Sequence, residues 1–277
     1  MQGRGVRVVR LKWRYRKRLR KKYGRLIWKV KNRKGRKGFF KSTVHRYPRR
    51  NYRILVANEY IAAHLAKSLG LPVARVIQAH VRGPRGRIKR GLISMQAKGG
   101  QVIPWKKAKK KLLKKPHKYV KQAKKLARLV AFDAWILNPD RSDRNLILHK
   151  KKSGKKYKWY GIDHGISLFG NPTKWNLRRA KKKFSCKKAY KFCLHSGDKK
   201  KQRIPRGLKR FTRDNRKQLG KMVKKIQAMP KGKLKKAIRR VPKGLLTKAE
   251  KKFIQKVLLC RHKHLKKALK RVSKHFA

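Results

Sequence analysis

Two short apolar runs near the start of the chain, residues 25–30 and 38–44, flank a basic stretch that contains glycine. Short runs rich in β-branched and aromatic residues, separated by such a stretch, predict a β-hairpin. Residues 71–81 and 90–96 predict two further strands around a second turn. Residues 1–24 are basic with few apolar positions, so we expect a strand and a loose arm there.

Residues 52–70 repeat apolar side chains at the period of a helix with one buried face. Gly70 follows the last apolar position, where a C-terminal cap is expected. The helical period returns after Pro104, breaks at Pro116 and continues to residue 137. The first part of the chain is therefore predicted to be a sheet with one helix packed on it.

A polar loop at residues 138–145 interrupts the helical pattern. It precedes a second predicted hairpin, formed by residues 146–149 and 158–163. From residue 170 the pattern is helical again, with breaks at Pro205, Pro230 and Pro242. The order of the elements indicates an α+β fold.

The chain of 277 residues carries 91 Lys and Arg against 8 Asp and Glu, a formal charge of +83. Such a supercharged surface attracts phosphate polymers, so we expect nonspecific binding of nucleic acid or other polyanions that weakens with salt. Hydrophobic residues make up 39% of the chain, which is enough for a core if the charges lie on outer faces. This composition excludes disorder along the whole chain.

No stretch approaches the roughly 20 apolar residues of a membrane span. The first residues lack the apolar segment of a secretory signal, so a cytoplasmic protein is expected. The three cysteines, Cys186, Cys193 and Cys260, cannot all pair. We interpret them as packing thiols in a reducing compartment, because their spacing is not that of a zinc site.

Five of the eight acidic residues fall in three short segments: Glu59, Asp133, Asp140, Asp143 and Asp163. The others are Asp198, Asp214 and Glu250. Glu250 and Thr247 have the spacing of a capping box at the start of a helix. Asp214 is expected in the first turn of another helix, where the macrodipole favours a negative charge.

The three segments supply the groups that phosphoryl transfer needs: a cation on the phosphates, an acid that holds this cation, a base, and oxygen ligands for magnesium. Lys41 ends the segment GFFK, which follows the glycine-containing turn, and Glu59 lies on the next helix. Asp140 and Asn145 lie in one loop, five residues apart, so one side chain can contact the acceptor while the other binds the metal ion. Asp163 ends the following strand, and carboxylate and amide oxygens suit Mg²⁺.

Residues 131–148 and 159–170 resemble the HipA-like kinases, which are similar in turn to type II phosphatidylinositol kinases. The resemblance extends to residues 39–41 and 57–74 and covers most of the chain from 25 to 270. It implies a bilobal protein-kinase-like fold. The small β-rich N-lobe would be residues 1–103 and the larger helical C-lobe residues 104–277, with Mg-ATP between them.

By this resemblance, Lys41 would hold the ATP phosphates and Glu59 would pair with Lys41. Asp140 would be the catalytic aspartate, while Asn145 and Asp163 would hold Mg²⁺. The implied reaction is transfer of the γ-phosphoryl group of ATP to a hydroxyl, on a protein Ser or Thr. The similarity to type II phosphatidylinositol kinases leaves an inositol lipid as an alternative acceptor.

These residues also have structural interpretations. Asp133 and Asp143 can cap turns or pair with Arg141 and Arg144, and Glu59 can be an exposed helix residue. His164 is interpreted as a packing residue at a strand end, and two aromatic side chains are assigned to the core: Trp135 and Phe169. A second function is also open, that of a catalytically weak or dead cationic scaffold that binds nucleic acid nonspecifically.

Overall fold

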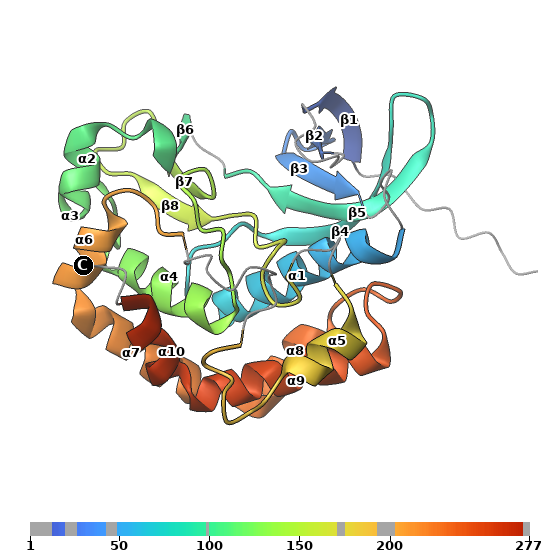
Figure 1. Cartoon of the computed structure of the whole chain (residues 1–277). Helices are drawn as coiled ribbons and strands as arrows, with labels where there is room; N and C mark the ends of the chain where they lie inside the picture. The colour runs from blue at the N-terminus through green and yellow to red at the C-terminus, as the bar shows by residue number, and fades with distance from the viewer. Residues whose placement is uncertain are drawn as a thin grey trace, which may run out of the picture. The chain divides into compact units, whose positions relative to one another are not determined.

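The computed structural model describes residues 13–19, 27–42, 49–97, 100–170, 175–192 and 203–273. The chain divides into two compact units, and each is described by itself. Unit 1 contains Met1–Arg49 and Arg75–Gln96, and unit 2 contains Arg50–Ala74 and Ala97–Ala277. Strands predominate in the N-terminal part and helices in the C-terminal part (Figure 1). The predicted α+β class is confirmed.

Unit 1 is a closed barrel of five strands. They are β1 (Trp13–Arg18), β2 (Ile27–Asn32), β3 (Lys37–Ser42), β4 (Val76–Arg82) and β5 (Ile88–Met95). Neighbouring strands follow the order β1-β2-β3-β5-β4 and are antiparallel, apart from the parallel pairing of β1 with β4 that closes the barrel. The closure joins Trp13 to Val81, a long-range pairing that no local sequence pattern predicts.

Aromatic side chains fill the interior of the barrel. Trp28 and Phe40 are fully buried and stack with their ring centroids 5.3 Å apart, and Ile93 packs in the same cluster. The strands β3 and β5 approach closely at Gly91, where a Cβ atom would collide with the carbonyl oxygen of Lys41. Glycine at this position therefore lets β5 pair tightly with the strand that carries Lys41.

Unit 2 contains a small antiparallel sheet in the order β6-β7-β8 and, apart from the first residue of α1, the helices of the described residues. Its strands are β6 (Gln101–Pro104), β7 (Leu146–Lys150) and β8 (Lys158–Gly161). The helices are α1 (Arg49–Ser68), η1 (Trp105–Lys107), α2 (Lys110–Lys114), α3 (Pro116–Tyr119), α4 (Lys124–Trp135), α5 (Leu177–Lys183), α6 (Leu208–Asp214), α7 (Arg216–Gln227), α8 (Lys231–Arg239), α9 (Lys248–Lys263) and α10 (Leu265–Ser273). Of the helices described, none combines the length and the apolar character that a membrane crossing requires.

Helix α1 buries the apolar face that the sequence predicts. Ile54, Ile61 and Leu65 are completely buried, and the chain turns after the helix at Gly70, whose φ of 69° is the left-handed geometry of a C-terminal cap. The contacts of α1 group it with unit 2. The division into lobes at residue 103 stays a prediction.

Helix α4 packs against α6, α7, α9 and α10. Its C-terminal end is held by the buried Arg261 of α9, whose guanidinium donates to the carbonyl oxygens of Ala134 and Trp135, the latter at 3.0 Å. Carbonyls in the last turn of a helix have no intrahelical partner, so a buried cation satisfies them and also opposes the helix dipole. The same guanidinium donates to the carbonyl oxygen of Ala189 at 2.6 Å.

The predicted capping box is confirmed. The Thr247 hydroxyl accepts from the Glu250 backbone, and the Glu250 carboxylate accepts from the Thr247 backbone at 2.8 Å. Burial tends to raise the pKa of Glu250, but hydrogen bonds from Arg53, Thr247 and Trp175 hold it below its ordinary value. The expectation for Asp214 is wrong, because Asp214 is the last residue of α6. Asp198 lies outside the described residues.

Cys186 and Cys260 form a disulfide. The interpretation of these two residues as packing thiols is therefore wrong, while Cys193 lies outside the described residues. The partners are 74 residues apart, and only the packing of α9 on the segment after α5 brings them together. The inference of a reducing compartment rested on unpaired cysteines, so this pair removes its support.

Candidate active site

The β7–β8 hairpin carries Asn145 and Asp163 at the same end. Leu146, the first residue of β7, pairs with Gly161, the last residue of β8. Beyond this pair, the Ile162 N–H donates to the Asn145 carbonyl oxygen at 3.0 Å. Asp163 follows immediately with a φ of 57°, a left-handed conformation that is uncommon outside glycine and concentrated at functional sites.

Residues 138–145 form a tight loop that its own side chains hold. The Asp140 N–H donates to the Asn138 side chain at 3.2 Å. The Asn145 amide donates to the Asp140 carbonyl oxygen at 2.7 Å and lies 3.5 Å from the Asp140 carboxylate. Asn145 is 7% exposed, whereas the Asp140 side chain is 30% exposed. The loop thus fixes the backbone of Asp140 and leaves its carboxylate within reach of solvent.

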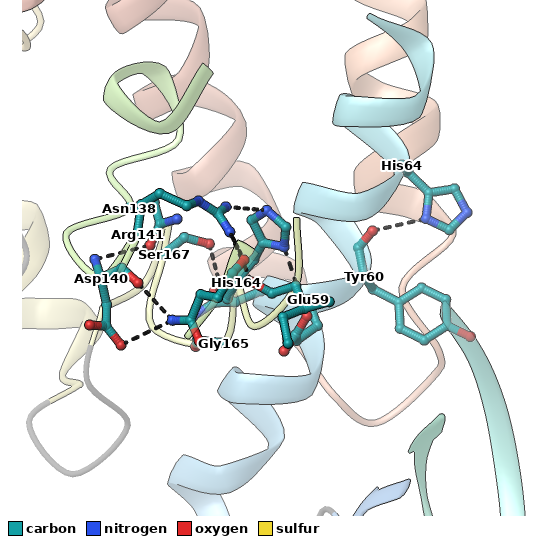
Figure 2. A network of polar contacts seen from close by, with 12 residues as sticks. Glu59, Tyr60, His64, Asn138, Asp140, Arg141, His164, Gly165 and Ser167 are labelled. Carbon is teal, nitrogen blue, oxygen red and sulfur yellow. Dashed lines mark hydrogen bonds and ion pairs between the residues drawn. The ribbon is translucent and has the colours of Figure 1, made fainter. Parts of the chain in front are cut away.

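Arg141 is the central residue of a buried polar network (Figure 2). Its guanidinium donates two hydrogen bonds to the Asp133 carboxylate, at 2.8 and 3.0 Å. It also donates to the carbonyl oxygens of Asn145 and Ile162, at 2.8 and 3.0 Å. The pairing of Asp133 with Arg141 that the sequence left open is confirmed. Through Arg141, the end of α4 and the end of the hairpin are joined by charge-assisted hydrogen bonds.

His164 continues this network to α1. The Arg141 guanidinium lies 2.7 Å from His164 Nε2, and His164 Nδ1 lies 4.0 Å from Glu59 Oε2 (Figure 2). A guanidinium can only donate, so Nε2 accepts and the ring proton is on Nδ1, facing Glu59. His164 and Glu59 are each 2% exposed, so the interpretation of Glu59 as an exposed helix acid is wrong. His164 does pack at the strand end as predicted, and it also links two charged side chains.

A neighbouring residue of α1 holds the turn after Asp163. The Asn58 amide donates to the Gly165 carbonyl oxygen at 2.7 Å, and its oxygen accepts from the Phe169 N–H at 3.3 Å. A Cβ at Gly165 would lie 3.3 Å from Leu55 and 3.6 Å from the Asp163 carboxylate. Asn58 and Glu59 therefore bind consecutive parts of the same turn from adjacent positions on one helix.

Two arginines cover the outer side of the 138–145 loop. The Arg203 guanidinium lies 3.1 Å from the Asp140 carboxylate, and the Arg206 guanidinium pairs with Asp143. Asp143 therefore pairs with Arg206 and not with Arg144. Sequence reasoning missed both arginines, because they lie about sixty residues beyond the loop in a chain where basic residues are everywhere.

The side chains present fit a divalent cation. The Asn145 amide nitrogen is directed at Asp140, so its Oδ1 points elsewhere and accepts no hydrogen bond from the described part of the chain. An amide oxygen and a carboxylate, carried by Asn145 and Asp163 at the same end of the hairpin, are donor types that suit Mg²⁺. No group of three or more His, Cys, Asp or Glu side chains gathers into a metal cluster within the described ranges. Any Mg²⁺ bound here would therefore complete its shell with other oxygens, such as phosphate and water.

The structure brings four of the five predicted site residues into one region of unit 2: Glu59, Asp140, Asn145 and Asp163. Lys41 lies on β3 of unit 1, where it pairs in register with Ile27 and Leu92. The ion pair between Lys41 and Glu59 stays a prediction. The core assignments are confirmed, since Trp135 and Phe169 are at most 1% exposed.

Residues 48–176 match the family of HipA-like kinases. Among solved structures, the Helicobacter pylori proinflammatory kinase CtkA is similar in fold, with a TM-score of 0.59 and 16% identity over 93% of this chain and 94% of that chain. HipA of Shewanella oneidensis MR-1, solved with HipB and operator DNA, has a TM-score of 0.43 and 15% identity over 86% of this chain and 60% of that chain. No curated protein has a significant match.

The matched segment contains the network around Arg141 and four of the predicted site residues: Glu59, Asp140, Asn145 and Asp163. The likeness to CtkA concerns the fold of nearly the whole chain. The resemblance read from the sequence is therefore confirmed: residues 48–176 match the HipA-like kinases, and the fold is similar to that of a solved kinase.

Proposed function

We propose that this protein is an ATP-dependent kinase that transfers the γ-phosphoryl group of Mg-ATP to a Ser or Thr hydroxyl of a protein. The observation that carries the proposal is the convergence of Asp140, Asn145 and Asp163 at one end of the β7–β8 hairpin. A carboxylate open to solvent, an amide oxygen and a second carboxylate are what a base and a magnesium site require.

Asp140 is the proposed base. As the acceptor oxygen forms its bond to the γ-phosphorus, its proton passes to the Asp140 carboxylate, and the bond from the γ-phosphorus to the β–γ bridging oxygen breaks. The electron pair of that bond leaves with ADP. The partly buried hydrogen bonds of the loop hold the Asp140 backbone in place, and such positioning is a main contribution that a protein makes to phosphoryl transfer.

Asn145 and Asp163 would hold Mg²⁺, and Lys41 would contact the phosphates with Glu59 as its partner. Magnesium bound there supplies positive charge that offsets the charge on the phosphates. In this proposal Asn145 has two roles. Its amide nitrogen holds Asp140 by a hydrogen bond, and its amide oxygen, which is directed away from Asp140, binds Mg²⁺. Glu59 is held beside His164 at the buried end of the network, which limits its side-chain freedom.

The test is transfer of labelled γ-phosphate from Mg-ATP to a Ser-containing protein acceptor by the parent and by Asp140→Ala. We expect transfer by the parent and a loss of about 100-fold or more in the variant, the usual contribution of a general base. Matching melting temperatures would show that the variant is folded. Full activity in the folded Asp140→Ala variant would contradict the assignment.

Binding of nucleic acid is a second candidate function, favoured by where the acidic side chains lie. Glu59, Asp133 and Glu250 are at most 3% exposed, so little negative charge remains on the surface to balance 91 Lys and Arg. Phosphate polymers should bind with counterion release. Duplexes of unrelated sequence should show equal affinities and the same steep loss of binding with salt. Weak binding that is insensitive to salt would remove this candidate.

A further inference from the structure

Residues 203–206 run across the outer side of the 138–145 loop, and hydrogen bonds fix this segment at both ends. The Arg203 N–H donates to the Pro139 carbonyl oxygen at 3.0 Å. The Arg206 N–H donates to the Asp143 carboxylate at 2.7 Å, and the Arg206 carbonyl accepts from the Trp105 indole at 2.9 Å. The backbone of the segment is therefore held against the loop that carries the proposed base.

The two guanidinium groups of this segment remain open to solvent. The side chains of Arg203 and Arg206 are 68% and 61% exposed although both contact a carboxylate. Arg203 uses a single Nη1 donor on Asp140, and Arg206 uses Nε on Asp143 and Nη2 on the Lys106 carbonyl oxygen. An arginine fork has more donors than these bonds use, so each keeps N–H groups that can bind a further anion.

Any acceptor hydroxyl must come within hydrogen-bond reach of Asp140, and therefore close to Arg203. The adjacent cations Arg144 and Lys106 are also exposed. Both carboxylates on this side, Asp140 and Asp143, are already paired with the arginines. Groups next to the acceptor hydroxyl therefore meet spare cationic donors, which attract carboxylates and repel Lys or Arg.

From this arrangement we propose that Arg203 and Arg206 form an acceptor subsite that selects peptides with Asp or Glu beside the phosphorylated Ser or Thr. This inference rests on the proposed kinase function and names the substrate class of the same site. A cationic protein attracts anions over its whole surface. The subsite is more specific, because its selectivity comes from residues 203–206, whose backbone is fixed beside the proposed base.

The experiment compares two peptides with one Ser each, one flanked by Glu and the other by Gln, at about 0.15 M salt, where the Debye length is near 8 Å. The readout is the ratio of kcat/KM for the Glu peptide to that for the Gln peptide. A general loss of catalysis lowers both values and leaves the ratio unchanged. We expect a ratio of about 10 or more in the parent, as one charge-assisted hydrogen bond would give.

Arg203→Glu should bring the ratio to 1 or below, and Arg203→Lys should keep most of it because the charge remains. Lys236→Glu is the matched control, since it makes the same change of net charge at an exposed position on α8 and should leave the ratio as in the parent. Arg144→Glu is a second variant inside the loop and should lower the ratio without removing a contact of Asp140.

The outcomes separate this inference from the kinase function. If Asp140→Ala abolishes transfer but Arg203→Glu and Lys236→Glu lower the ratio equally, the kinase stands and the subsite is wrong. A ratio near 1 in the parent, or transfer to an inositol lipid and to neither peptide, also overturns the subsite. Full activity in Asp140→Ala would instead contradict the kinase assignment itself.

Discussion

The Asp133 carboxylate and the Arg141 guanidinium form a two-point ion pair, with side-chain exposures of 0% and 2%. One partner lies on α4 and the other in the loop with Asp140. Burying two charges is costly, and the cost is met only while each has its partner. The ion pair therefore anchors the 138–145 loop to helix α4.

Replacing Arg141 with Met should lower the free energy of unfolding by about 3–5 kcal/mol, because it leaves the Asp133 carboxylate buried and unpaired. Urea unfolding of the two proteins measures the difference. Arg144→Met is the control, since Arg144 is the exposed arginine of the same loop and should change stability by no more than about 0.5 kcal/mol. Equal effects of the two substitutions would mean that the buried pair does not stabilise the fold.

Replacing Asp163 with Asn should weaken the magnesium-dependent part of ATP binding, because it removes one negative charge from the proposed metal site. Calorimetry with ATP, with and without Mg²⁺, measures this part without requiring turnover. We expect Mg²⁺ to raise the affinity for ATP about 10-fold or more in the parent and much less in the variant. Asp214→Asn, an exposed acid at the end of α6, is the control for the loss of one charge. An unchanged magnesium effect in Asp163→Asn would exclude this residue as a ligand.

The stability that Glu250 contributes should depend on pH. Its folded pKa is held below the ordinary value, so its hydrogen bonds with Arg53 stabilise the folded state fully above the ordinary carboxyl range. That contribution is lost as the pH falls through the folded pKa, because the unfolded chain binds the proton more tightly. Glu250→Gln should thus cost about 1–3 kcal/mol near pH 7 and progressively less in acid. A difference that does not vary with pH would contradict the lowered pKa.

Reducing the Cys186–Cys260 disulfide should lower the free energy of unfolding. The bond closes a loop with a sequence separation of 74, and the chain-entropy model gives a loss of about 4 kcal/mol for a loop of this length. Cys186→Ser, unfolded in denaturant beside the parent, measures the same quantity without a reductant. Cys193→Ser leaves both partners in place and is the control. Equal stability of the parent and Cys186→Ser would show that the bond adds nothing to the fold.

Much of the architecture could be predicted because it depends on local patterns. The period of residues 52–70 predicts α1, and the chemistry of Thr247 and Glu250 predicts the start of α9. The β7–β8 hairpin follows from two short apolar runs, and its geometry places Asn145 and Asp163 at one end. These features need only residues that are close in the sequence.

The contacts that the sequence did not reveal connect distant segments. The closure of β1 onto β4, the Cys186–Cys260 bond and the approach of Arg203 to Asp140 depend on how whole elements pack. The pattern of charges in the sequence does not predict which ion pairs form, because each carboxylate has 91 Lys and Arg as candidate partners. Burial is the better guide, because Asp133 pairs with Arg141 and both side chains are buried.

Arg261 lies 85 residues beyond the last residue that matches the kinase family. It nevertheless binds the carbonyl oxygens of Ala134 and Trp135, at the end of the helix that precedes the 138–145 loop. A fragment trimmed to residues 48–176 would retain Asp140, Asn145 and Asp163 but lose this support. We therefore expect that a fragment that folds around the 138–145 loop must extend through α9, well past residue 176.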